Sequence, residues 1–221
     1  MSLFWGDVMK KVFLYLYPIK EYPSVLTFSN EYYESHGWEK PFKVLNECIQ
    51  KRYREKGYEV IFVTYPDKEI YGVDVKENDM VITTDVTFKE ATGYDENGKE
   101  KPIEDVKYPS EEDMMRKVGP VDHITIGGYH FADCVKRVAE YFYSHGIDTL
   151  VDLELTDLFF TLYRKEKFNK GEYNTGAFKE RLMSSLSRYG SEFAENQLNN
   201  MYGSPIYHFN DDTELESIKK R

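Results

Sequence analysis

The chain has 221 residues, of which 41% are hydrophobic, 31% charged and 16% aromatic, and its formal net charge is −10. This balance excludes a disordered chain, and the acidic charge disfavours nucleic acid and membrane surfaces as partners, because proteins that bind polyanions present a basic face. The two cysteines imply no disulfide framework, and no apolar run is long enough to span a bilayer. We therefore expect a cytoplasmic protein.

Strand-like and helix-like segments alternate along the first 160 residues. The predicted elements are a strand at 12–17, a helix within 40–56, strands at 60–64 and 79–84, a short helix from 111, a strand at 121–126, a helix at 132–145 and a strand at 149–153. Gly57 is placed to end the second element, and Ser110 to cap the short helix. Residues 89–110 are polar and predict an excursion or a β-hairpin that turns at Asn97-Gly98.

This alternation predicts a three-layer α/β/α, Rossmann-like fold with a mostly parallel sheet of five or six strands. We expect residues 1–160 to form the core domain, residues 161–209 a helical extension that packs on the core or on a partner subunit, and residues 210–221 a charged tail. In such sheets, ligands bind beyond the carboxyl ends of the strands. Three segments are expected at that edge: residues 17–22, 85–88 and 127–134.

The turn that ends at Cys134 carries the clearest chemical signal. A cysteine in the first turn of a helix lies beside unpaired backbone N–H groups and the positive end of the helix dipole, which favour the nucleophilic thiolate. The same N–H groups are suited to stabilise an oxyanion. Gly127-Gly128 permits a tight turn or a close approach of the backbone to a ligand. His130 and Asp133 are nearby titratable groups.

Structural roles compete with these chemical ones. Free cysteines are usually buried and inert, so a packing role for Cys134 stays open, and Cys48 is expected in the core because it lies on an apolar helical face. His123, within a strand, is expected to be structural or partly exposed. The pair of glycines lacks the third glycine of a dinucleotide fingerprint, and neither a cofactor nor a metal is expected. A solvated strand end is favoured over metal ligands for three acids: Asp152, Glu154 and Asp157.

The order of residues around the cysteine is distinctive. The strand Ile124–Gly128 ends in glycine, five residues follow, then come Cys134-Val135 and a helix closed by Gly146, twelve residues after the cysteine. This pattern resembles the isochorismatase-like cysteine hydrolases, a family that includes nicotinamidases, carbamoyl-amide hydrolases and isochorismatase. The resemblance extends over residues 11–160 and implies the fold predicted above.

The resemblance implies a Cys-Asp-Lys triad in which Cys134 is the nucleophile. The family's aspartate falls at the end of the first strand, where the nearest acid in this chain is Glu21. The family's lysine falls near Thr84, where the nearest lysine is Lys89. Two of the three catalytic groups are therefore missing from their expected positions, and a nucleophile without its base loses orders of magnitude in rate.

Two functions remain open. The first is a divergent isochorismatase-like protein that binds a small molecule at the strand ends without hydrolysing it, as a homo-oligomer. The second is an active cysteine hydrolase that attacks an amide or related acyl bond. For the second, the expected catalytic residues are Cys134 with His130 or Asp85 as base. For both, the expected ligand-binding residues are Tyr17, Phe88, Gly127, Gly128, Tyr129 and Asp133.

Overall fold

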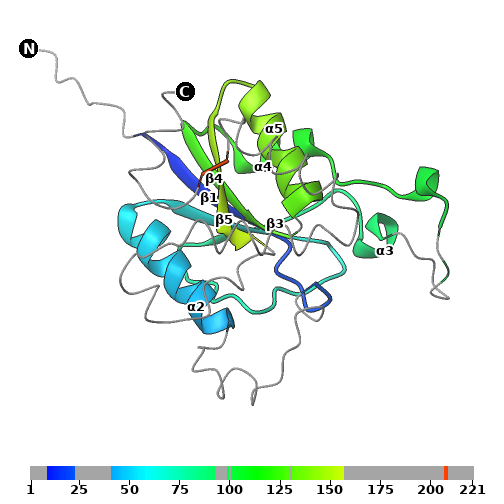
Figure 1. Cartoon of the computed structure of the whole chain (residues 1–221), viewed down its shortest axis with the longest axis horizontal. Helices are drawn as coiled ribbons and strands as arrows, with labels where there is room; N and C mark the ends of the chain where they lie inside the picture. Colours follow the sequence, from blue (N-terminus) through cyan, green and yellow to red (C-terminus); the bar gives the residue numbers. More distant parts are fainter. Residues whose placement is uncertain are drawn as a thin grey trace, which may run out of the picture.

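A single parallel sheet of six strands, in the order β3-β2-β1-β4-β5-β6, organises the protein (Figure 1). The computed structural model describes residues 9–22, 41–92, 99, 101–129, 131–156 and 207–208. The strands are β1 (Lys11–Leu16), β2 (Glu59–Thr64), β3 (Met80–Thr83), β4 (His123–Gly128), β5 (Asp148–Thr156) and β6 (Tyr207–His208). The helices are α2 (Pro41–Cys48), α3 (Phe88–Ala91), α4 (Glu111–Val118) and α5 (Lys136–Ser144). The predicted fold class is confirmed.

The central strand β1 is buried on both faces, and its side chains alternate between two core clusters. Val12, Leu14 and Leu16 pack in the cluster that α4 and α5 cover. Phe13 and Tyr15 pack in the cluster that α2 covers. Figure 1 shows α4 and α5 together on one side of the sheet and α2 on the other. This arrangement explains the continuous apolar run in the sequence, since a strand covered on both faces has no polar side.

Local signals at the helix ends act as predicted. The helix expected within 40–56 is α2, continued by a π-helical turn at Ile49–Tyr53 and a 3₁₀ turn at Arg54–Lys56. Gly57 ends it with a φ of +76°, a left-handed conformation that favours glycine. The Ser110 side chain caps α4 by accepting a hydrogen bond from the backbone N–H of Asp113.

The described part of the segment after β3 contains two short helical pieces joined by irregular backbone, and no hairpin strand occurs in that part. Thr87 and Glu90 form a reciprocal capping box: the Thr87 hydroxyl accepts from the Glu90 N–H, and the Glu90 carboxylate accepts from the Thr87 N–H at 3.0 Å. These two bonds start α3, and a short 3₁₀ turn follows at Ile103–Asp105. The predicted turn at Asn97-Gly98 lies outside the described residues.

The order in which the chain adds strands to the sheet reverses at β1. The chain leaves β1 toward β2 and β3, then returns to the opposite side of β1 with β4, which is the order that opens a ligand crevice beyond the strand ends. Gly128 pairs with Leu16 at this point. Its φ is +109°, and a Cβ there would lie 2.2 Å from the carbonyl oxygen of Leu16. Gly127 and Gly128, expected in the turn, therefore belong to β4 and allow it to stay paired to its end.

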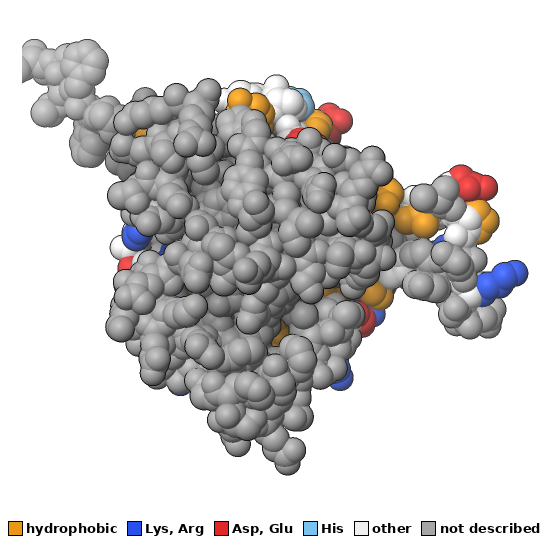
Figure 2. Space-filling view, viewed as in Figure 1, with side chains coloured by type: hydrophobic (Ala, Val, Ile, Leu, Met, Phe, Trp, Pro, Cys, Tyr) orange, Lys and Arg blue, Asp and Glu red, His pale blue; other side chains and the backbone are white. Residues whose placement is uncertain are grey.

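Most of the predicted helical extension and charged tail lies outside the described residues. Residues 207–208 form β6, which runs parallel to β5. Within the described ranges, no helix combines the length and apolar character needed to cross a bilayer. Acidic and basic side chains both occur on the described part of the surface in Figure 2.

We predict that Gly128→Ala lowers the free energy of unfolding by about 3 kcal/mol or more, because the new methyl group would overlap the backbone of Leu16. The matched control is Gly57→Ala, which also places alanine at a positive φ but has open space around the new Cβ. The control should cost only about 1 kcal/mol. Urea denaturation of the three proteins measures both values, and equal losses in the two variants would refute the close approach of β4 to β1.

Candidate ligand site at the strand ends

Five aromatic side chains meet beyond the carboxyl ends of the strands, and we call them the strand-end cluster: Tyr17, Tyr22, Tyr65, Phe88 and Tyr129. Tyr17 stacks on Tyr65, with ring centroids 4.7 Å apart and an interplanar angle of 16°. The Tyr22 ring lies 5.7 Å from that of Phe88 and 5.9 Å from that of Tyr129. Tyr17, Tyr65 and Tyr129 are only 1% exposed, whereas Tyr22 and Phe88 are partly exposed. The cluster thus has a buried base and an accessible rim.

Three of the predicted ligand-binding residues, Tyr17, Phe88 and Tyr129, belong to this cluster. Each follows the end of a different strand, so the parallel sheet brings them to one edge. Tyr22 and Tyr65 were not singled out from the sequence. Both lie in loops that directly follow β1 and β2, and this position is the signal that would have identified them.

Tyr17 adopts a backbone conformation that is unusual for its residue type. Its φ is +56°, which lies in the left-handed region that residues other than glycine rarely adopt. Its N–H donates to the carbonyl of Val63 at 2.8 Å, and its own carbonyl accepts from the N–H of Ile19 at 2.8 Å. Such a conformation costs about 1–3 kcal/mol and concentrates at functional sites. The surrounding contacts hold this strain at the predicted ligand edge.

Two phenol hydroxyl groups of the cluster are directly bonded. The Oη atoms of Tyr22 and Tyr65 lie 3.1 Å apart. Burial raises the pKa of Tyr22 to about 12, although the hydrogen bond with Tyr65 opposes this shift. Burial also raises the pKa of Tyr65, with a further contribution from Tyr22. Both phenols therefore remain protonated at neutral pH and act as hydrogen-bond donors. Only one of their two protons can lie between the oxygens, so the other is directed to a different acceptor.

Cys134 lies in a π-helical turn, Phe131–Val135, between β4 and α5. It is partly exposed and packs against the core cluster that contains Tyr17. Its Sγ is 3.9 Å from Oδ2 of Asp133, which is long for a thiol hydrogen bond. After burial, charge on Cys134 is the next largest cause that raises the pKa of Tyr17, so the thiol is within electrostatic range of the cluster. Turns of this type often occur at functional sites.

The two residues expected to serve as base are not brought into the cluster by any described contact. His130 lies outside the described residues. Asp85 is exposed, and its Oδ1 accepts a hydrogen bond from the backbone N–H of Ser110 at 2.9 Å. That contact holds the start of α4. The role of either residue as base stays a prediction.

An ion pair that sequence reasoning missed lies beside the cluster. Nζ of Lys68 is 2.5 Å from Oε1 of Glu21 and 4.4 Å from the centroid of the Phe88 ring. Burial raises the pKa of Glu21, but the hydrogen bond from Lys68, a backbone hydrogen bond and the charge of Lys68 together outweigh this effect, and the net shift is downward. The resemblance described above predicts a lysine near Thr84, after β3, whereas Lys68 follows β2. Its place soon after a strand end is the signal that would have found it.

Asp152 is a correction to the sequence analysis, which placed it at a solvated strand end. It is fully buried, because β5 continues to Thr156 and leaves Asp152 in the middle of the strand. Its Oδ2 accepts from the Tyr53 hydroxyl at 2.5 Å and lies 3.5 Å from Nη1 of Arg52. Glu154 and Asp157 are not among the side chains that the structure describes. Among those it does describe, no group of three or more His, Cys, Asp or Glu residues is arranged to hold a metal.

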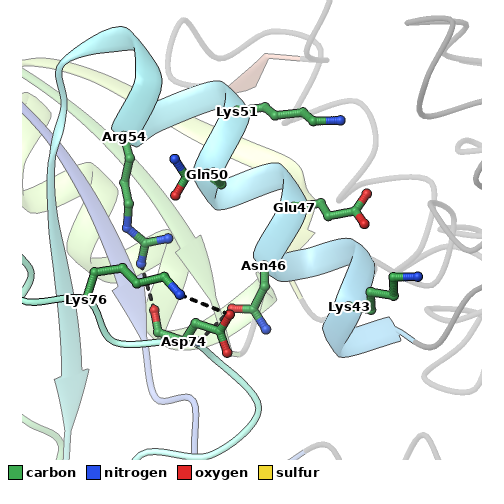
Figure 3. A pocket seen from close by; sticks show the side chains of 8 residues that line it. All are labelled: Lys43, Asn46, Glu47, Gln50, Lys51, Arg54, Asp74 and Lys76. Carbon is green, nitrogen blue, oxygen red and sulfur yellow. Dashed lines mark hydrogen bonds and ion pairs between the residues drawn. The ribbon is translucent and has the colours of Figure 1, made fainter.

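A polar groove of about 370 Å³ lies between α2 and residues 72–76 (Figure 3). Arg54 makes a two-point contact with Asp79, with bonds of 3.0 and 2.5 Å, and also donates to the backbone carbonyl of Asp74 at 2.8 Å. Lys76 pairs with the Asp74 side chain at 3.3 Å. Arg54 holds the loop on the helical segment and Lys76 pairs within the loop. Both cations are therefore already neutralised, and the groove is a weaker candidate than the strand-end cluster.

Comparisons with known proteins find only weak structural likenesses. No family model matches the chain, and no curated protein matches it in sequence. Among solved structures, an isochorismatase family protein is 15% identical with a TM-score of 0.41, covering 67% of this chain and 82% of its own. A candidate Mar1 ribonuclease from Leishmania major is 11% identical with a TM-score of 0.41, covering 96% and 90%. An isochorismatase-like hydrolase from Alkaliphilus metalliredigens is 8% identical with a TM-score of 0.38, covering 74% and 80%.

Two of these three structures therefore carry the name of the superfamily that the Cys134 segment resembles. With identities of 15% or less and TM-scores of 0.41 or less, these proteins give no information on the activity of this chain, and its chemistry has to be argued from its own residues.

We predict that Tyr22 makes stability depend on pH in the alkaline range. Its pKa is about 12 in the folded protein, against the ordinary value of 10, so the unfolded chain releases this proton first as the pH rises. The free energy of unfolding should therefore fall between pH 10 and about 12. Tyr22→Phe should remove part of this fall, whereas the control Tyr71→Phe, at a side chain that is 43% exposed, should not. Urea denaturation at pH 8, 10 and 11 measures the slopes, and parallel curves for wild type and Tyr22→Phe would contradict the assignment.

Proposed function

We propose that this protein binds a small planar molecule at the strand-end cluster. The observation that carries the proposal is the convergence of five aromatic rings beyond the ends of β1 and β4, where the strand order reverses. These rings have a buried base and a partly exposed rim. Ligand sites in proteins are mostly apolar and aromatic, with a few convergent polar groups, and in α/β sheets they form at this position.

The cluster suggests how such a ligand is held. The rings of Tyr22 and Phe88 form the rim and offer apolar faces and edges to a planar molecule. The hydroxyl pair of Tyr22 and Tyr65 offers a proton to an oxygen acceptor on the ligand. Together these groups fit a ring that carries a carbonyl or carboxylate oxygen.

Labelling of Cys134 tests this proposal. Cys134 is partly exposed and Cys48 is 0% exposed, so iodoacetamide should modify Cys134 first in the folded protein. Benzamide and benzoate, each at about 10 mM to reach millimolar affinities, are the probes. We expect at least one of them to slow the labelling of Cys134 about 5-fold, because the thiol is within electrostatic range of Tyr17, Tyr22 and Tyr65.

Phe88→Ala should abolish this protection, because it removes part of the rim. Tyr71→Ala is the control, since Tyr71 is an exposed tyrosine that contacts Phe42 rather than the cluster. Labelling followed by mass spectrometry gives the rate at each cysteine. If neither probe protects Cys134 or raises the melting temperature, the proposed function is wrong.

A second candidate function, amide hydrolysis, is favoured by one further observation: Asp133 places a carboxylate 3.9 Å from the Cys134 sulfur. In this reaction Asp133 accepts the thiol proton, and the sulfur attacks the acyl carbon. Backbone N–H groups of the turn at 131–135 stabilise the oxyanion. Asp133 then passes this proton to the departing amine as the C–N bond breaks. Water, deprotonated by Asp133, hydrolyses the thioester, and the proton returns to the sulfur.

For this second function, ammonia release from benzamide should fall at least about 100-fold in Cys134→Ala, because the nucleophile is lost. Cys48→Ala is the control, since Cys48 is a fully buried core residue at the end of α2, and its folded fraction should retain the wild-type rate. Wild-type turnover that survives in Cys134→Ala would exclude Cys134 as the nucleophile. Binding of benzamide without turnover by the wild-type protein would exclude hydrolysis and leave ligand binding as the proposed function.

A further inference from the structure

Lys68 lies where the loops that follow β1, β2 and β3 meet. Its ammonium group contacts Glu21 from the first loop at 2.5 Å and lies 4.4 Å from the ring centroid of Phe88 from the third. The Phe88 ring in turn contacts Tyr65 at 5.4 Å and Tyr22 at 5.7 Å. One cation is thus in direct contact with the rim of the strand-end cluster.

The backbone around Lys68 is held in place on both sides. Its N–H donates to the carbonyl of Tyr65 at 3.1 Å, and its carbonyl accepts from the Thr64 hydroxyl at 3.3 Å. Next to it, Asp67 accepts a hydrogen bond from the backbone N–H of Phe88 at 2.7 Å. These bonds fix the spacing between the lysine and the aromatic rim. The position of the Lys68 backbone is therefore set by the fold and does not depend on the ion pair with Glu21.

The ion pair itself is suited to exchange. The Glu21 side chain is 39% exposed and the Lys68 side chain 23% exposed. Ion pairs at such exposed positions add little stability, because water solvates both partners well. Lys68 keeps its contact with the Phe88 ring when the carboxylate changes, and that contact also favours a cation. Another carboxylate can therefore replace that of Glu21 at small cost.

We infer that the ligand of this site is an aromatic monoanion whose carboxylate replaces Glu21 on Lys68. The inference rests on the proposed function and adds the charge of the ligand to it. The ring of the ligand lies on the rim formed by Tyr22 and Phe88, and its anionic group meets the ammonium at the edge of that rim. Glu21 acts as an internal competitor that keeps the cation neutralised and lowers the affinity for every anionic ligand.

Benzoate and benzamide test this inference, since they share size and planarity and differ in charge. Their dissociation constants follow from the protection of Cys134 against iodoacetamide. Benzoate should bind more tightly than benzamide. Lys68→Met, which keeps an apolar chain on Phe88, should weaken benzoate about 10-fold. Glu21→Gln should lower the dissociation constant of benzoate about 3-fold. Both variants should change the dissociation constant of benzamide by a smaller factor than that of benzoate.

The matched controls are Lys10→Met and Glu59→Gln. Lys10 and Glu59 also form a Lys–Glu pair, 3.1 Å apart with side chains 35% and 54% exposed, but at the amino ends of β1 and β2. Neither control should alter the binding of either probe. A change in the controls similar to that in the test variants would mean a general charge effect and would overturn the inference.

Three further results would overturn it while the proposed function stands. They are equal affinity for the two probes, benzoate binding that survives Lys68→Met, and benzoate binding that weakens in Glu21→Gln. A failure of both probes to protect Cys134 in the wild-type protein would overturn the inference and the proposed function together. Tighter benzoate binding in Glu21→Gln, with loss in Lys68→Met and unchanged controls, would establish the exchange.

Discussion

Gly128 lets the backbones of β1 and β4 approach each other closely at the point where the strand order changes direction. Because no Cβ separates Gly128 from Leu16, the two strands stay paired to their ends, and the carbonyl of Leu16 also accepts from the N–H of Tyr129 at 3.0 Å. Tyr17 and Tyr129 therefore leave the sheet from neighbouring points. Their rings, with those of the loops after β2 and β3, fill one space. The strand-end cluster is a consequence of this contact.

The electrostatics of the cluster favour binding over acid–base chemistry. Burial keeps Tyr22 and Tyr65 protonated at neutral pH, so these phenols donate hydrogen bonds and do not act as bases. Glu21 is ionised beside Lys68, which lowers its basicity. Hydrolysis would depend on Cys134 and its neighbour Asp133, whereas binding depends on the rings, a donor and a cation that the fold already holds in place. For this reason the binding function stands first and hydrolysis second.

Much of the fold was predictable because its signals are local. Apolar runs, the stop at Gly57 and the cap at Ser110 each act within a few residues, and the order of strands and helices then restricts the topology. Part of the site was predictable for the same reason, since Tyr17, Phe88 and Tyr129 follow strand ends that a parallel sheet brings to one edge. The base positions were not, because the family pattern assigns them to places that this chain fills with other residues.

The sequence by itself determined the elements, the parallel sheet and the edge at which a ligand is expected, because those follow from hydrophobic period and from short-range turn and cap chemistry. Only the tertiary structure decided which polar and charged side chains meet. Lys68 and Glu21 are 47 residues apart, and Tyr53 and Asp152 are 99 residues apart. No local pattern encodes either pairing. An ion pair of this kind depends on side chains that the folded sheet brings within a few ångströms, and burial sets its strength only after the chain has closed around it.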